Sequence, residues 1–274
     1  MTTGEQLVPD VSVTQRLLGA AAGRGSRPAL AGSEEVGDRT YGGLASTIQA
    51  AAAGLAWRGL RPRDVVGVLV PDAVCYVLAS HAIRAAGGVP SPLADGLSVA
   101  DMAGQLADCG ARMLITARPL AAVALAAADR SWVRQVISFG EAPGAIPFDA
   151  LLAAGTLRPA PGRRTDLALL PYARFGDGQL CPAGLTQHEL AADLCALTSR
   201  ICGTDVVIAA PPSGDGRAYA TLLDRALLSG ATVVAAPASR LAEAAAAWQG
   251  TVAVVPRCAD VSGYASLRVL AVAG

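Results

Sequence analysis

The hydrophobic positions of this 274-residue chain follow two periods that alternate along most of its length. Apolar residues recur at helical spacing in residues 41–58 and again in residues 72–86, so each stretch predicts a helix with one buried side. Between them, residues 64–70 form a continuous apolar run that ends at a proline, which is typical of a strand buried on both faces. The same alternation of predicted helices and short strands continues to residue 139.

A segment rich in Pro, Gly and Arg, residues 157–164, interrupts this pattern. Beyond it, the apolar pattern predicts a helix over 186–202 and strands at 206–210, 230–235, 252–255 and 267–272. Alternating strands and helices indicate parallel sheets with helices on their faces. We therefore expect an α/β protein of two stacked lobes, residues 1–164 and 165–274, with largely parallel sheets flanked by helices.

Composition narrows the class of function. The chain has 22 basic and 22 acidic residues and a net charge of zero, so we expect neither a nucleic acid nor a membrane as partner. All the basic residues are arginine, and no lysine amine is available as a Schiff base or phosphate clamp. Residues 1–10 lack a signal-peptide pattern and no apolar run is long enough to cross a bilayer, so a cytoplasmic location is expected.

The six cysteines and two histidines do not show the spacing of a metal site. No two cysteines form a CxxC pair, and the histidines, His81 and His188, lie far apart in the sequence. We expect no metal, no other cofactor and reduced thiols. His81 is interpreted as a residue on a helix face.

Short motifs occur in a fixed order along nearly the whole chain. They are Arg27–Leu30 with Thr40–Leu44, Gly59–Val66, Ile83–Pro90, Leu227–Val234 and Ser266–Leu270. Their order and spacing resemble the adenylate-forming superfamily, which includes acyl-CoA ligases of the 4-coumarate-CoA ligase kind, luciferases and peptide-synthetase adenylation domains. The resemblance implies the N-terminal half of such an enzyme, without its β-barrel and C-terminal domain.

The resemblance fails at the loop that carries the family's chemistry. There, a loop rich in Ser, Thr and Gly and containing one lysine cradles the phosphates of ATP. The matching stretch is residues 171–182, in which Ala173 and Arg174 replace the serines and Cys181 replaces the lysine. A shifted alignment places Ala183 at the lysine position instead.

The same stretch also loses the threonines, which are replaced by Gly176 and Asp177. A carboxylate at Asp177 adds repulsion where a polyphosphate would lie. Arg174, Gly176 and Gly178 are the candidate phosphate-binding residues of this degenerate loop, and we expect them not to function. The family's PxFHxxG loop reads Pro211–Gly216 here, and the chain stops before the family's YGxTE motif.

Cys181, His188 and Asp177 are the candidates for a replacement chemistry. A thiol beside a helix N-terminus has a lowered pKa, and His188 follows seven residues later, so a Cys–His nucleophile pair is conceivable. Asp177 and Asp215 are both loop carboxylates, which can act as acid and base or bind a metal. The alternatives are a drifted loop with a partly buried thiol and aspartates that stabilise turns.

These features together predict a pseudoenzyme, an acyl-CoA ligase-like protein that has lost ATP-dependent adenylation. It would act as a scaffold or partner protein in a biosynthetic pathway, as a homodimer or in a hetero-complex, because an incomplete sheet leaves an edge to be covered. Two alternatives remain. One is an enzyme of altered chemistry at the remnant cleft, and the other is a non-catalytic binder of an acyl, aryl or CoA ligand.

Overall fold

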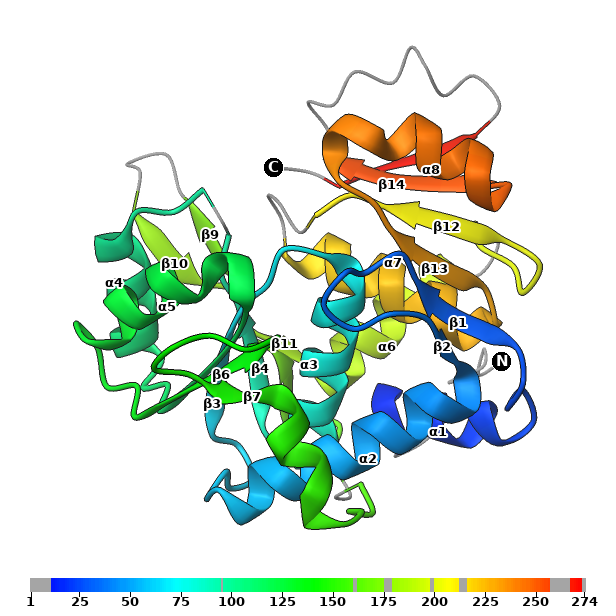
Figure 1. Cartoon of the computed structure of the whole chain (residues 1–274). Helices are drawn as coiled ribbons and strands as arrows, with labels where there is room; N and C mark the ends of the chain where they lie inside the picture. Colours follow the sequence, from blue (N-terminus) through cyan, green and yellow to red (C-terminus); the bar gives the residue numbers. More distant parts are fainter. Residues whose placement is uncertain are drawn as a thin grey trace, which may run out of the picture.

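Two mainly parallel sheets, each flanked by helices, form the molecule, which confirms the predicted α/β class (Figure 1). The computed structural model describes residues 11–94, 96–159, 162–174, 179–197, 200–211, 216–256 and 267–272. The helices α3 (Ala73–Ala85) and α7 (Gly216–Ser229) lie between the two sheets and contact each other. Most of the buried hydrophobic side chains form one cluster that runs through both lobes.

The first sheet has five parallel strands in the order β4-β3-β5-β6-β7. Their bounds are β3 Val65–Leu69, β4 Val89–Pro92, β5 Met113–Ala117, β6 Gln135–Phe139 and β7 Ile146–Pro147. The helices α4 (Val99–Asp108) and α5 (Ala121–Ala128) cover the face away from the second sheet (Figure 1). A separate apolar cluster, which includes Met102, Leu106 and Leu114, fills the space between these helices and the sheet.

The second sheet has six strands in the order β15-β14-β12-β13-β1-β2, and only β2 runs antiparallel. Their bounds are β1 Pro28–Ala31, β2 Arg39–Thr40, β12 Val206–Ala209, β13 Thr232–Ala235, β14 Val252–Pro256 and β15 Arg268–Val272. The helix α8 (Leu241–Trp248) covers its outer face (Figure 1). β1 and β2 come before residue 164 in sequence, yet they belong to the sheet that holds the strands after it.

Polar side chains cap the N-termini of five helices in the described part of the chain. The side chains of Ser12, Thr40, Asp72, Ser98 and Thr186 each accept a hydrogen bond from a backbone N–H of the following first turn. They precede α1 (Val13–Ala22), α2 (Tyr41–Trp57), α3, α4 and α6 (Gln187–Ala196). The remaining helical segments are single-turn or irregular 3₁₀ helices at Arg118–Leu120, Phe148–Ala154 and Ala238–Arg240.

The prediction of a helix over 186–202 is wrong at its C-terminal end. The helix α6 ends at Ala196, and the chain makes a turn before it enters β12. Asp205 stabilises this turn because its carboxylate accepts a hydrogen bond from the backbone N–H of Cys202, at 2.7 Å. Apolar periodicity alone does not report such a side-chain bond.

Two short antiparallel strand pairs lie in residues 167–186, between the first sheet and α6. β8 (Leu167–Leu169) pairs with β11 (Leu185–Thr186), and β9 (Tyr172–Arg174) pairs with β10 (Leu180–Pro182), both antiparallel. Each strand is two or three residues long, which is too short for a clear alternation of polar and apolar positions.

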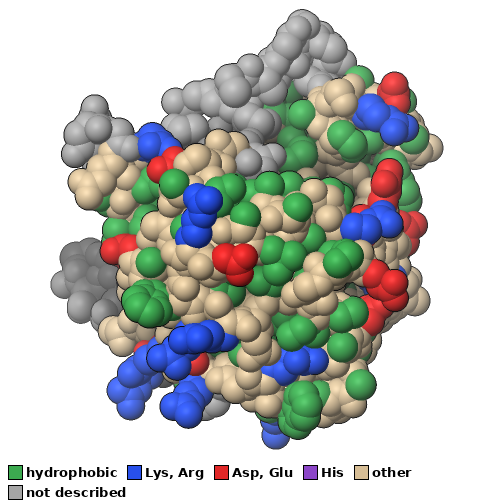
Figure 2. All heavy atoms as spheres, turned by 60° about the vertical axis from the view of Figure 1, so that its left-hand side comes forward, with side chains coloured by type: hydrophobic (Ala, Val, Ile, Leu, Met, Phe, Trp, Pro, Cys, Tyr) green, Lys and Arg blue, Asp and Glu red, His purple; other side chains and the backbone are tan. Residues whose placement is uncertain are grey.

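No helix in the described part of the chain has the length and apolar character needed to cross a membrane. Cys75, Cys109, Cys181, Cys195 and Cys202 are free thiols, and Cys258 lies outside the described residues. Charge is unevenly distributed on the surface despite the net neutrality: Figure 2 shows several arginine side chains gathered on the lower part of one face.

Candidate functional site

The stretch that the sequence resemblance aligns with the family's phosphate loop forms the β9–β10 hairpin. In its register Cys181 lies opposite Ala173, and Leu180 lies opposite Arg174. The candidate residues Gly176, Asp177 and Gly178 lie outside the described residues, as does Asp215. The structure therefore tests the two ends of this loop, at Arg174 and Cys181.

Cys181 lies within the strand β10 and not at a helix N-terminus. Its side chain is half-buried, and the next helix, α6, begins at Gln187 after its cap, Thr186. The Thr186 hydroxyl accepts a hydrogen bond from the backbone N–H of Glu189, and the Glu189 carboxylate accepts one from the backbone N–H of Thr186. Together they form a capping box at the start of the helix. The positive end of the helix is therefore occupied by its own cap rather than by the thiol.

His188 is the second residue of α6, and its side chain is exposed. Its Nδ1 accepts a hydrogen bond from Nη2 of Arg164, at 2.8 Å. Among the described residues, no hydrogen bond joins the His188 ring to Cys181. The structure therefore does not bring these two candidates together as a nucleophile and its base, an arrangement that needs direct contact.

Arg174 extends from the end of β9 toward the first turn of α4. Its Nη2 lies 3.5 Å from Oδ2 of Asp101, and both side chains are about half exposed. This exposed ion pair contributes little to stability, but the Asp101 carboxylate offsets part of the positive charge that Arg174 presents at the loop. At the other end of β9, the hydroxyl of Tyr172 donates a hydrogen bond to Asp108, and burial together with this carboxylate raises the pKa of Tyr172.

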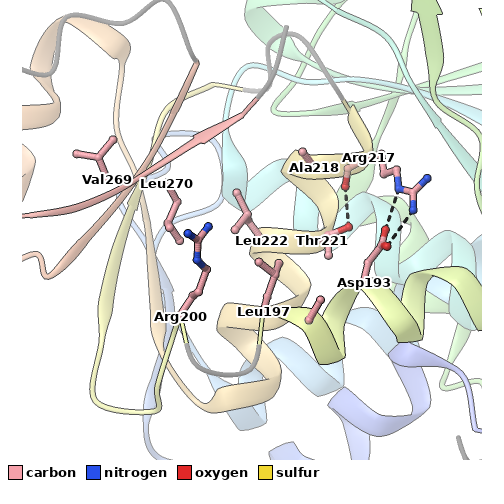
Figure 3. Close-up of a pocket in the computed structure, with 10 residues that line it drawn as sticks. Asp193, Leu197, Arg200, Arg217, Ala218, Thr221, Leu222, Val269 and Leu270 are labelled. Carbon is pink, nitrogen blue, oxygen red and sulfur yellow. Dashed lines mark hydrogen bonds and ion pairs between the residues drawn. The ribbon is translucent and has the colours of Figure 1, made fainter.

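A pocket lies between α6, α7 and β15, and we call it the α6–α7 pocket (Figure 3). Its volume is about 360 Å³. Its lining side chains are Asp193, Ala196, Leu197, Arg200, Arg217, Ala218, Thr221, Leu222, Val269 and Leu270. Mostly apolar walls with a few polar groups are typical of small-molecule sites.

The two arginines of this pocket differ in whether a carboxylate of the described residues pairs with them. Nε and Nη2 of Arg217 donate to the two carboxylate oxygens of Asp193, at 2.8 and 2.9 Å, so these two side chains form a fork-like ion pair. Arg200 points toward the space that Leu222 and Leu270 also face (Figure 3). No ion pair of Arg200 is found in the described part of the chain. The sequence pattern did not single out this pocket, because its walls come from three separate elements.

His81, interpreted from the sequence as a helix-face residue, belongs to a buried polar cluster between α1, α3 and α7. Its Nε2 lies 3.1 Å from Oδ1 of Asp224, and its Nδ1 lies 2.9 Å from Oγ1 of Thr14. Nη1 of Arg84 lies 2.8 Å from the other oxygen of Asp224, and Nε of Arg84 donates to the carbonyl oxygen of Ala168. The cluster therefore joins α3 and α7 to β8.

This cluster resembles a catalytic His–Asp pair in its bonding but not in its access. The side chains of His81, Arg84 and Asp224 are 1, 2 and 5% exposed, so a substrate cannot reach them. Burial lowers the pKa of His81, although Asp224 acts in the opposite direction. For Asp224, burial acts to raise the pKa, and the neighbouring Arg84 and His81 outweigh it and lower the pKa. We assign the cluster to packing.

Metal-ion binding gains no support from this geometry. No group of three or more His, Cys, Asp or Glu side chains suitable for a metal occurs among the residues that the structure describes. The candidate carboxylates Asp177 and Asp215 are outside that part of the chain. The described site thus consists of a hairpin without a lysine, an ion-paired arginine and the α6–α7 pocket.

The chain is similar to known proteins over most of its length. Residues 18–259 match the family model described as AMP-binding enzyme. Over 200 residues the chain is 30% identical to the 4-coumarate--CoA ligase-like 9 protein of Oryza sativa subsp. japonica, which covers 69% of this chain and 35% of the rice protein.

Among solved structures, a long-chain-fatty-acid-CoA ligase from Archaeoglobus fulgidus is similar with a TM-score of 0.80 and 20% identity, over 92% of this chain and 52% of the ligase. MbtA of Mycobacterium smegmatis is similar with a TM-score of 0.80 and 25% identity, over 90% of this chain and 49% of MbtA. The chain thus spans about a third of the rice relative and about half of these two solved proteins. Since the family model covers most of its residues, this chain belongs to the AMP-binding enzyme family.

Proposed function

We propose that this chain does not activate acids with ATP and acts instead as a scaffold or partner protein beside biosynthetic enzymes. The observation that carries the proposal is the hairpin at the phosphate-loop position. Its second strand has Cys181 where the family has a lysine, and the chain contains no lysine at all. The packing framework of the family is retained around it.

Electrostatics explains why this change matters. A triphosphate carries several negative charges, and the family's loop balances them with backbone N–H groups, hydroxyls and a lysine cation. Among the described residues of the hairpin, Arg174 carries the positive charge, and Asp101 pairs with it. Replacing hydroxyls by Ala173 and adding a carboxylate at Asp177 both weaken phosphate binding further.

ATP–pyrophosphate exchange tests the proposal directly. The purified chain would be incubated with ATP, labelled pyrophosphate and a panel of fatty and aromatic acids, with an active family member as the positive control. We expect exchange no higher than that of a heat-denatured sample. Exchange above this background that is lost in the Arg174→Ala variant would overturn the proposal.

The α6–α7 pocket favours a second candidate function, the binding of an acyl or aryl carboxylate without turnover. Leu197, Leu222 and Leu270 would contact the apolar part of such a ligand, and Arg200 would bind its carboxylate. Calorimetry with octanoate and benzoate tests this function.

Variants of the pocket sharpen this second test. Arg200→Ala should weaken carboxylate binding, and Leu222→Trp should abolish it by filling the pocket. Arg240→Ala removes an exposed arginine outside the pocket and should have no effect. Failure of both acids to bind, or equal binding by the wild type and Leu222→Trp, would exclude this function.

A further inference from the structure

A hollow rich in arginine lies at the amino ends of three neighbouring strands of the five-stranded sheet. Its volume is about 540 Å³. We call it the arginine hollow, and it is lined by Arg58, Gly59, Leu60, Arg61, Asp64, Val65, Gly110, Arg112, Met113, Arg134 and Gln135. The strands β3, β5 and β6 begin at or beside Val65, Met113 and Gln135, so the hollow sits where these parallel strands start.

Four arginines and one aspartate line this hollow. Among the ion pairs of the described residues, none uses Arg58, Arg61, Arg112 or Arg134. The carboxylate is that of Asp64, whose Oδ2 accepts a hydrogen bond from the backbone N–H of Arg61 at 2.9 Å. Its charge therefore offsets only part of the positive charge.

Neighbouring Arg63 shows what these arginines lack. Its Nη2 lies 3.0 Å from Oδ1 of Asp166, so its charge is paired within the chain. Arg58, by contrast, is half-buried, and its Nε has no hydrogen-bond partner in the described structure. The described structure gives the Arg58 guanidinium a ring contact with Trp57, at 5.7 Å from the ring centroid, and no carboxylate partner.

The backbone that carries these side chains is held by hydrogen bonds. The backbone N–H of Arg134 donates to the carbonyl oxygen of Arg112 at 2.8 Å, and Nε2 of Gln135 donates to the carbonyl oxygen of Arg58 at 3.1 Å. These bonds link the starts of β5 and β6 to the end of α2. The arginines therefore project from a fixed rim and not from a long loop.

A second hollow of about 320 Å³ adjoins the first and adds a flat apolar surface. It shares Gly110, Arg112 and Arg134 with the arginine hollow, and Trp132 lines its other side. The Trp132 side chain is large and hydrophobic, yet it is 62% exposed. An exposed tryptophan next to guanidinium groups is suited to stack on a planar ring.

We propose that the arginine hollow binds a phosphorylated small molecule that carries a flat ring, the class to which nucleoside phosphates belong. Arg58, Arg61, Arg112 and Arg134 hold the phosphates, because the planar fork of a guanidinium matches phosphate oxygens. Trp132 stacks on the ring. The inference does not depend on the function proposed above.

This hollow is separate from the degenerate phosphate loop. Arg174 of the β9–β10 hairpin pairs with Asp101, in the first turn of α4, which follows the carboxyl end of β4. The arginine hollow lies at the opposite ends of the strands, about 15 Å away along a five-residue strand. A ligand bound in the arginine hollow would therefore not occupy the β9–β10 hairpin.

Calorimetry with two probes, ATP and tripolyphosphate, tests the proposal on the full chain at about 0.1 M salt. Both should bind with a saturable isotherm. The double variant Arg112→Ala/Arg134→Ala should weaken both by at least about tenfold. Trp132→Ala should weaken ATP binding and leave tripolyphosphate binding unchanged, because only ATP has a ring.

The matched control removes two arginines elsewhere. Arg16 and Arg240 are exposed, and Arg16→Ala/Arg240→Ala makes the same change in net charge without touching the hollow. It should bind both probes as the wild type does, and thermal melting would confirm that all variants fold. Absence of saturation below about 10 mM for both probes, or unchanged affinity in the Arg112/Arg134 variant, would overturn the site. Equal affinity of the wild type for ATP and tripolyphosphate would overturn the role of the ring.

Discussion

At the scale of single residues, Gly54 sets how closely α2 packs against the 3₁₀ helix at Phe148–Ala154. A Cβ at this position would clash with the carbonyl oxygen of Leu151 and lie 2.5 Å from its Cα. The obstacle is backbone, which cannot rotate away as a side chain does. This glycine is required by a close approach and not by its backbone angles.

Gly54→Ala is therefore expected to lower the free energy of unfolding by at least about 2 kcal/mol, measured by urea denaturation. Gly104→Ala is the matched control, because Gly104 is also within a helix but a Cβ there would meet no atom within 4 Å. Since alanine favours helix more than glycine, this variant should be as stable as the wild type or more so. Equal destabilisation by both substitutions would contradict the packing argument.

The buried cluster of His81, Arg84 and Asp224 contains a second residue-scale prediction. Asp224→Ala leaves the Arg84 guanidinium buried without its carboxylate, which is expected to cost about 3–5 kcal/mol in the free energy of unfolding. Asp193→Ala breaks the partly exposed pair with Arg217 and should cost about 1 kcal/mol or less. The two variants would be compared by urea denaturation at neutral pH, and similar losses would argue against a special role for the buried cluster.

At the scale of elements, one carboxylate holds the outermost strand β15 against its sheet. Asp205, at the start of β12, accepts hydrogen bonds from the backbone N–H of Cys202, the hydroxyl of Thr251 and the guanidinium of Arg268. Burial by itself raises the pKa of Asp205, but these donors outweigh it and hold the pKa at about 2. Because Arg268 begins β15, the bonds join β12 to that strand.

This pKa predicts a specific acid sensitivity. A carboxylate whose pKa is lower in the folded state contributes stability above its unfolded pKa, about 4, and loses it as the pH falls through the folded value. Asp205→Asn should therefore be less stable than the wild type at pH 6, and this difference should shrink between about pH 4 and pH 2. Urea midpoints at a series of pH values would measure it. A difference that stays constant over this range would contradict the assignment.

Most elements were predictable from local patterns, and the exceptions have a common cause. Helix starts at Ser12, Thr40 and Asp72 carry their own caps, and buried strands such as β3 and β5 are continuous apolar runs. The hairpin β9–β10 makes side-chain bonds to α4, and the turn after α6 is stabilised by a side-chain bond from Asp205 to the backbone. Local periodicity contains no signal for these.

At the scale of the whole molecule, β15 is the outermost described strand on one side of the six-stranded sheet. It is mostly apolar, reading Arg-Val-Leu-Ala-Val, and an edge strand of this kind pairs readily with another chain. We therefore expect a homodimer or a stable complex with a second protein. Light scattering of the purified chain at micromolar concentration tests the homodimer.

The matched variant for this test is Val269→Lys, which places a charge on the edge strand. It should shift a dimer to the monomer, and thermal melting would check that the variant still folds, since Val269 also packs against the apolar cluster under the sheet. A wild type that is monodisperse as a monomer would exclude the homodimer, and the prediction would then depend on co-purification with the product of a neighbouring gene. Absence of a complex there as well would contradict it.

Within the candidate site, the residue types of the stretch that resembles the phosphate loop are readable from the sequence, but their surroundings are not. The replacement of the family's lysine is a matter of residue identity, so it is readable without a structure. That Cys181 lies in a strand, that His188 bonds to Arg164 and that Arg174 pairs with Asp101 are results of chain packing. As a result, no hydrogen bond joins Cys181 to His188 in the described structure, although only seven residues separate them in the sequence.

The sequence by itself determined the α/β class, the order of most elements and the loss of lysine, because each is local or a property of composition. Only the tertiary structure decided where charge and apolar surface accumulate. It brought Asp224 to His81 and Arg84 across 140 or more residues, and it gathered four arginines of a neutral chain around one hollow. The physical reason is that net charge and composition are sums over residues and contain no distances, whereas electrostatic interactions and binding depend on the distances between groups.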